Sequence, residues 1–272
     1  MKKYFIAAAA LMLPAAPAFA QDEPAEPITI SGSVAIVSDY RFRGVSQSDE
    51  ELAVQGGFSV SHESGFYVGT WASNLAGWGT FGGSNTELDI YGGFKAPVGP
   101  VTIDVGVTWY MYPGGSDITD FAEPYVKLSG TAGPASLTLG VAYAPKQEAL
   151  GNWSATPESE EGDKEDNFYI WGDVAGGIPD TPITLKAHLG YSNGNPGLGP
   201  NGTSVAPTGK YVDYMVGADV AVGPVVLGIA YVGTDISYED RAYLADIGSF
   251  INTKDGSSIS SGKIVGSISA AF

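Results

Sequence analysis

The stretch Val101-Thr-Ile-Asp-Val-Gly-Val-Thr-Trp-Tyr-Met-Tyr112 is the clearest signal of the fold, because its side chains alternate between two kinds. One set is apolar and consists of Val101, Ile103, Val105, Val107, Trp109 and Met111. The other set is smaller or more polar and consists of Thr102, Asp104, Gly106, Thr108, Tyr110 and Tyr112. Successive side chains of a β-strand point to opposite faces, whereas a helix would scatter the apolar set around its cylinder. The stretch therefore predicts a strand with one apolar and one polar face.

The same alternation recurs in about twelve segments along the chain, each of about ten or more residues, which is the length that a membrane-spanning strand needs. The predicted strands are 28–43, 53–62, 66–75, 85–96, 100–112, 121–131, 134–144, 167–176, 182–193, 211–222, 224–235 and 262–272. A soluble β-sandwich also alternates, but it would leave the apolar faces of these strands without cover. Lipid is the simplest cover for them.

The connections between these segments alternate in length. Tight turns fall at 63–64, 97–99, 132–133, 179–181 and 223, and longer links fall at 44–52, 76–84, 113–120, 145–166, 194–210 and 236–261. An up-and-down barrel has short periplasmic turns on one rim and long extracellular loops on the other. We therefore predict an all-β protein, a transmembrane up-and-down antiparallel β-barrel of about 12 strands over residues 28–272, with both termini periplasmic.

The first 20 residues have the features of a secretory signal peptide. Lys2 and Lys3 precede an apolar run over residues 4–13, and Ala18-Phe19-Ala20 is a small-x-small cleavage site. Residues 21–27 are expected to form a short polar leader. The chain has no cysteine, so no disulfide supports it. We expect cleavage after Ala20 and localisation in the outer membrane of a Gram-negative cell.

The last predicted strand ends in an aromatic residue. Ile264, Ile268 and Phe272 share its apolar face. An apolar alternating strand with a terminal aromatic resembles the C-terminal signal that the barrel-assembly machinery reads. The expected partners are therefore this machinery, outer-membrane lipids and lipopolysaccharide.

The charge of the chain argues against nucleic acid as a partner. The sequence has 13 Lys and Arg against 30 Asp and Glu, for a net charge of −17. Removal of residues 1–20 takes away two lysines, which gives 11 − 30 = −19. Binding to nucleic acid depends on neutralising phosphates, so such a chain would repel it.

Motifs for catalysis or cofactor binding are missing from the sequence. There is no phosphate-binding loop, zinc signature or dinucleotide fingerprint. His62 and His188 have no serine partner that the sequence can assign, and we expect both to be structural. We expect no cofactor and no enzymatic activity. An outer-membrane lipid hydrolase is the third interpretation that we keep open.

If the apolar residues face lipid, the alternation fixes which charges point into the lumen. A charged side chain on the lipid face costs about 2–4 kcal/mol near the membrane centre, so this sorting is enforced. The residues predicted to line the lumen are Asp39, Arg41, Arg43, Glu87, Asp89, Asp104, Glu123, Lys127, Asp173, Lys186, Asp213 and Asp219. On the first strand, Tyr40 and Phe42 are expected to face lipid. The lumen is either a plug of ion pairs or a wet channel that selects solutes, and the sequence leaves both open.

Two long links are acidic. Residues 145–166 and 236–261 carry more Asp and Glu than Lys and Arg. They either coordinate divalent cations beside lipopolysaccharide or attract cations to the mouth, or they form a solvated surface.

Three segments near the N-terminus carry a family resemblance. Val37-Ser-Asp-Tyr-Arg-Phe-Arg-Gly-Val-Ser-Gln-Ser-Asp49, Gln55-Gly-Gly-Phe58 and His62-Glu-Ser-Gly-Phe-Tyr-Val-Gly-Thr-Trp-Ala-Ser-Asn74 resemble the TorF family of porin-like proteins, proteobacterial exported proteins also known as Gcw_chp. The resemblance implies an outer-membrane barrel and passive transport, and it supplies no substrate and no site residues.

The first of these segments also suggests how a loop is held. We expect Arg41 and Arg43, with Asp39 and Asp49, to form an ion-pair cluster that holds the loop over residues 44–51 near the lumen.

The predicted function is a porin-like channel for passive diffusion of small polar solutes or ions. The alternative is a closed structural or adhesive barrel that acts through its extracellular loops.

Overall fold

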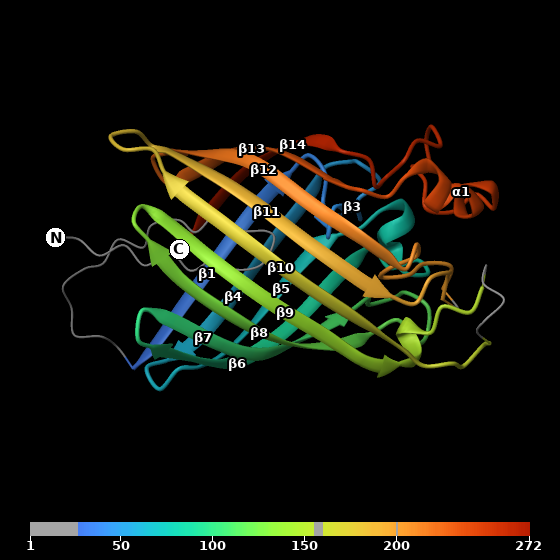
Figure 1. Cartoon of the computed structure of the whole chain (residues 1–272), viewed down its shortest axis with the longest axis horizontal. Coiled ribbons are helices and arrows are strands. Elements are labelled where there is room, and N and C mark those ends of the chain that lie inside the picture. The colour runs from blue at the N-terminus through green and yellow to red at the C-terminus, as the bar shows by residue number, and fades with distance from the viewer. Residues whose placement is uncertain (1–26, 155–159, 200) are drawn as a thin grey trace.

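A computed structural model describes residues 27–154, 160–199 and 201–272 as a closed antiparallel β-barrel (Figure 1). Within these ranges the barrel strands are β1 (Ile28–Val37), β4 (Ala53–His62), β5 (Phe66–Asn74), β6 (Thr86–Val98), β7 (Val101–Met111), β8 (Phe121–Ala132), β9 (Ala135–Gln147), β10 (Glu165–Gly177), β11 (Ile183–Gly194), β12 (Lys210–Val222), β13 (Val225–Thr234) and β14 (Lys263–Ala271). The predicted barrel of about twelve strands is confirmed. The predicted signal peptide (1–20) lies outside the described residues, and the predicted leader reaches them only at Pro27.

The first and last strands close the ring. Ile36 of β1 faces Val54 of β4 on one side and Ile268 of β14 on the other. At the end of this seam Gly32 and Phe272 exchange two backbone hydrogen bonds of 2.8 and 2.9 Å. The last residue of the chain therefore takes part in closing the barrel.

The outer surface of the barrel is apolar. Ile30 of β1, Leu139 of β9 and Ile264 of β14 are 69%, 64% and 65% exposed on the outside. On each strand the residues on either side of such an outward-facing residue face inward. In water such a belt of large exposed apolar side chains would be unfavourable, and in a bilayer it faces hydrocarbon. The barrel therefore has the surface of a membrane-spanning protein. No helix in the described ranges is long and apolar enough to cross a membrane.

The two rims of the barrel differ (Figure 1). At one rim, here called the turn rim, Gly99-Pro100, Gly133-Pro134 and Gly223-Pro224 each join two strands directly. The three glycines have φ of 62°, 60° and 59°, as the first position of a tight hairpin turn requires. The described chain starts and ends at the turn rim. The long connections, with the helix α1 (Tyr238–Asp246), lie at the other rim, here called the loop rim.

The first strand is shorter than predicted. β1 ends at Val37, and residues 38–52, here called the inner loop, fold into the barrel as the two short strands β2 (Arg41–Phe42) and β3 (Val45–Ser46). The prediction that Tyr40 and Phe42 face lipid is wrong, since Tyr40 is 1% exposed and Phe42 is half-buried inside. A strand over residues 28–43 would have about 16 residues, whereas a membrane-spanning strand needs about 9–11.

Glycines in the wall make room for large rings inside. A Cβ atom at Gly140 would lie 2.2 Å from the ring of Trp171, and one at Gly190 would lie 2.2 Å from the Tyr169 hydroxyl. Because these two positions have no side chain, the rings of Tyr169 and Trp171 lie flat against the wall and stack at 5.3 Å. The wall and the contents of the lumen are thus fitted to one another.

This fit predicts that adding even one methyl group to the wall, where it faces a buried ring, lowers the stability of the barrel. Gly140→Ala should lower the free energy of unfolding by about 1–3 kcal/mol, because Trp171 is buried and has to shift. Gly177→Ala, where a Cβ meets open space, should leave it unchanged or raise it slightly. Urea titration of the protein refolded into lipid vesicles measures both, and equal effects of the two variants would contradict the packing argument.

Candidate functional site

The inner loop crosses the loop-rim half of the lumen, which we call the loop half, and touches the wall on several sides. Its turn is formed by Arg43 and Gly44, with φ of 48° and 80°. A Cβ at Gly44 would lie 2.6 Å from the carbonyl oxygen of Gly233 on β13, so only glycine allows this approach. Within the loop, Ser46 Oγ donates to Asp39 Oδ1 over 2.6 Å. The turn is therefore fixed both locally and by the wall.

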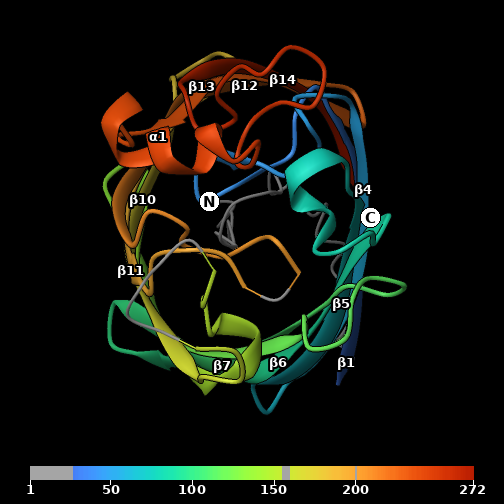
Figure 2. The same ribbon diagram turned by 90° about the vertical axis from the view of Figure 1, so that its right-hand side faces the viewer.

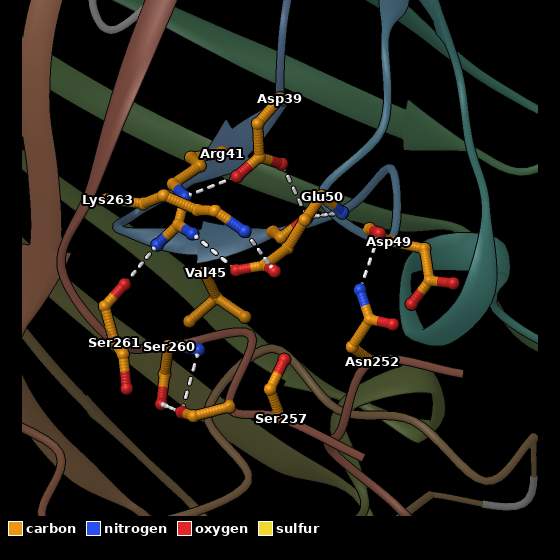
Figure 3. A network of polar contacts seen from close by, with 12 residues as sticks. Asp39, Arg41, Val45, Asp49, Glu50, Asn252, Ser257, Ser260, Ser261 and Lys263 are labelled. Carbon is orange, nitrogen blue, oxygen red and sulfur yellow. Dashed lines mark hydrogen bonds and ion pairs between the residues drawn. The ribbon is translucent and has the colours of Figure 1, made fainter. Parts of the chain in front are cut away.

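Arg41 connects the inner loop to the segment that precedes β14 (Figure 3). Its guanidinium pairs with Asp39 at 2.6 Å and with Glu50 at 3.2 Å, and it donates to the carbonyl oxygens of Gly44 and Ser261 at 2.9 and 2.7 Å. The expected Arg41–Asp39 pair is confirmed. Only 3% of the Arg41 side chain is exposed. The four acceptors therefore replace the water that this buried cation has lost.

Arg43 spans the lumen. Its Nη2 donates to both carboxylate oxygens of Glu123 on β8 at 2.7 Å, and its guanidinium lies 4.0 Å from the ring centre of Tyr169 on β10. β8 lies five strands from β1 in the ring of twelve, which is almost the opposite wall. The expectation that Arg43 joins Asp39 and Asp49 is wrong, because Arg43 stands in the turn of the inner loop and its side chain pairs with Glu123 on β8 instead.

Tyr40 anchors the inner loop to β5 and β6. Its hydroxyl donates to Glu87 Oε1 over 2.7 Å, and its ring meets Trp71 edge to face at 5.4 Å. Tyr40 belongs to an apolar cluster that also holds Phe81 and Tyr112. Packed side chains as well as ion pairs therefore hold the inner loop in the loop half.

A second apolar cluster lies between the inner loop and the last loop, residues 235–262 between β13 and β14. It joins Val45 to Trp78 and to Phe250 and Leu244 of the last loop. The cavity between Phe42, Trp78 and Phe250 is about 10 Å³, the room of one water molecule. Seen from the loop rim, the loops lie across the opening of the strand ring (Figure 2).

The last loop holds the inner loop from outside. Asp49 accepts hydrogen bonds from the backbone and the hydroxyl of Thr253, and its carbonyl oxygen accepts from Asn252 over 2.8 Å. Asp49 thus bonds the last loop, not the arginines as expected. An exposed pair joins Lys254 to Glu51, and this hydrogen bond raises the pKa of Lys254.

The last loop also contains α1, whose first turn is capped. Ser237 accepts from the backbone of Asp240 and its own backbone donates to the Asp240 carboxylate. This hydrogen bond from the Ser237 backbone, together with that from its side chain, lowers the pKa of Asp240.

The half of the lumen next to the turn rim, which we call the turn half, is wet. Lys95, Lys127 and Lys186 point inward, yet 48%, 15% and 24% of their side chains are exposed. Lys127 and Lys95 lie 3.3 and 3.9 Å from Asp104, and Lys186 lies 2.7 Å from Asp219. Because these side chains are inside the barrel, their exposure means that the turn half of the lumen is accessible to solvent.

His188 lies where the two halves meet. Its Nδ1 is 2.7 Å from Asp173 and its Nε2 is 2.9 Å from Asp213, with the Tyr169 hydroxyl at 3.0 Å. The Tyr169 ring also lies against the guanidinium of Arg43. The contacts of Arg43, Tyr169 and His188 therefore connect the inner loop to the middle of the lumen.

The other histidine, His62, is exposed at the turn rim. Its Nδ1 lies 2.7 Å from Ser64 Oγ and accepts from the Ser64 backbone, a local turn contact.

The structure places the twelve predicted residues on the inner side of the barrel. The loop half holds Asp39, Arg41, Arg43, Glu87, Asp89, Glu123 and Asp213, and the turn half holds Asp104, Lys127, Asp173, Lys186 and Asp219. Their role in lining a pore stays a prediction. Sequence reasoning missed Tyr40, Glu50 and Ser261 as parts of the site. The excessive length of the first predicted strand was the one signal that pointed to an inward fold.

Metal binding by the acidic links stays a prediction as well. Residues 145–166 are only partly described. In the part of the chain that is described, no group of three or more His, Asp and Glu side chains has the arrangement of a metal site.

Two solved porin structures share the fold. The NanC porin aligns with a TM-score of 0.53 at 11% identity, over 90% of this chain and 99% of that chain. The KdgM porin aligns with a TM-score of 0.52 at 8% identity, over 89% and 99%. At these identities the likeness shows the fold alone. No curated protein matches the chain in sequence. A family model described as "Bacterial protein of unknown function (Gcw_chp)" matches residues 21–264.

The pair that crosses the lumen should be strongly coupled. Arg43→Met should lower the free energy of unfolding by about 3–5 kcal/mol, because it leaves Glu123 buried without a counter-charge. Arg43→Met with Glu123→Leu should recover much of this loss. Urea titration in vesicles measures the double-mutant cycle. Lys146→Met, which breaks an exposed pair with Glu165, is the control and should have a much smaller effect. Additive effects at Arg43 and Glu123 would contradict the coupling.

Proposed function

Because this chain belongs to the Gcw_chp family, whose function is unknown, we propose its activity from its own lumen: it is an outer-membrane channel for the passive diffusion of small polar solutes or ions. In the conformation described, the inner loop crosses the loop half and narrows it. The channel needs no cofactor and carries out no covalent chemistry.

The wet, charged lumen is the observation that carries this proposal. Lys95 and Lys186 keep contact with water inside a barrel whose outer face is apolar. Charged side chains are expensive at membrane depth unless water or a counter-charge is present. An interior of this kind suits the passage of polar solutes better than a purely structural barrel.

The inner loop is placed so that it can move without opening the wall. Val37 and Ala53, which flank the loop, pair directly with each other, so the ladder between β1 and β4 is complete without it. Much of what holds the loop consists of ion pairs and hydrogen bonds, which water can replace. The inner loop is therefore a removable constriction inside a closed ring.

Several features support the outer membrane as the location. The family match begins at residue 21, next to the predicted cleavage site after Ala20. Phe272 directly follows the closing strand β14, where the assembly machinery would read it. The short turns favour a periplasmic turn rim, which places the loop rim beside lipopolysaccharide. The resemblance to the TorF family and the fold shared with two porins agree with passive transport.

The alternative, a closed barrel that acts through its loops, is favoured by the two apolar clusters. The clusters around Tyr40 and around Phe250 bury large side chains in the loop half. If they never separate, no solute passes.

Conductance in planar bilayers tests the proposal. The purified protein should give small single-channel steps, and Arg41→Ala with Arg43→Ala should enlarge them severalfold by releasing the inner loop. A second variant, in which a short glycine linker replaces residues 39–51, should do the same, because the wall does not need them. Arg241→Ala, an arginine on α1 at the loop rim, is the matched control and should conduct like the wild type.

The two functions give opposite results. Liposomes that contain the folded protein should swell in a small sugar or amino acid, and faster with the shortened loop. A folded barrel that neither conducts nor admits solutes, even with the inner loop removed, would overturn the channel and leave the structural barrel.

A further inference from the structure

We propose that Glu87, Asp89 and Glu123 form a binding site for monovalent cations, which makes the channel prefer cations to anions. The inference rests on the proposed function and names the class of solute that the same lumen takes. The ligands in view are alkali metal ions and small ammonium compounds.

The three carboxylates lie on the same side of the loop half, on β6 and β8. Glu87 and Asp89 are two residues apart on β6, so both point inward. Glu123 lies on β8, and Tyr110 of β7 lies between them, paired with Asp89 and with its hydroxyl 3.4 Å from Glu123. Glu87, Asp89 and Glu123 are 2%, 8% and 3% exposed.

The cluster has too few positive charges of its own. Arg43 is the counter-charge of Glu123, and Glu87 accepts a hydrogen bond from the Tyr40 hydroxyl. Asp89 Oδ1 has no hydrogen-bond partner among the described residues, and no ion pair in that part of the chain includes Asp89. A buried carboxylate without a partner is costly. A cation from solution is the complement that the cluster lacks.

The arrangement also limits the kind of cation. The described carboxylates do not converge as a metal-binding group would, so the site is not one for a tightly coordinated divalent ion. Arg43 already places a monovalent guanidinium between Glu123 and the ring of Tyr169. When the inner loop moves, a solute cation can take the place of this tethered one.

The cations of the turn half lie beside carboxylates. Among the described residues, Lys95 and Lys127 share Asp104, and Lys186 lies beside Asp219. His188 lies between Asp173 and Asp213, so that region adds negative rather than positive charge. The uncompensated charge of the lumen is therefore negative and lies beside the inner loop.

Reversal potentials in a tenfold KCl gradient test the site. The wild type and the variant with Arg41→Ala and Arg43→Ala should both favour K⁺ over Cl⁻, the variant more strongly because it loses positive charge. Asp89→Asn and Glu87→Gln, which keep the side-chain shape, should each lower the K⁺ to Cl⁻ permeability ratio by at least about twofold, the effect of one unit charge across several ångströms of water. Asp117→Asn, an exposed acid at the loop rim, is the control and should leave the ratio unchanged.

The outcomes separate the two claims. Absence of current in the wild type and in both loop-released variants would overturn the proposed function and this inference with it. Channels that conduct without cation preference, or whose preference survives both Asp89→Asn and Glu87→Gln, would overturn the cation site alone. Heat-modifiable migration of each variant in gels shows that it is folded before its current is compared.

Discussion

The structure depends on one constraint, which is that lipid offers no hydrogen-bond partner to a backbone group. Each strand must therefore pair on both sides, and the first strand must meet the last. The seam between β1 and β14 fulfils this requirement, and Phe272 extends it by its two bonds to Gly32. Closure then divides the alternating side chains into a set that faces lipid and a set that is confined to the lumen. The charges of the lumen are a consequence of this division.

Because the wall is closed without it, the inner loop does not have to pair with any barrel strand. Since Val37 pairs with Ala53, the residues between them can adopt a shape that suits the lumen. Arg43, Asp49 and Glu50 all have positive φ, three of the seven such non-glycine residues in the described chain. Strained backbone persists only where surrounding contacts hold it, and here those contacts are Glu123 and the last loop. The inner loop is thus stabilised by contacts that it makes only while it is inside the barrel.

The limits of sequence reasoning follow from the same features. Alternation, turn lengths and the terminal aromatic predicted the closed barrel, because strand period and lipid contact act at each residue locally. Alternation failed at Tyr40 and Phe42, where the period of two continued after the strand had ended. The prediction of ion-pair partners failed in part for a different reason. Arg41–Asp39 is local and was predicted, whereas Arg43–Glu123 joins residues far apart in sequence, and their meeting depends on the barrel diameter and on the direction of the loop turn.

The uncompensated negative charge of the lumen and the inner loop, which narrows the lumen, lie at the same level along the barrel axis. In the turn half, Lys95 and Lys127 share Asp104, Lys186 lies beside Asp219, and Asp173 adds a third carboxylate, so that half is nearly balanced. In the loop half, Glu87 and Asp89 have no cation of their own, and the nearest guanidinium belongs to the inner loop. Movement of this loop would therefore widen the passage and remove positive charge in one step. The segment that limits the size of a solute would then also modulate how strongly the channel prefers cations, with no second gate required.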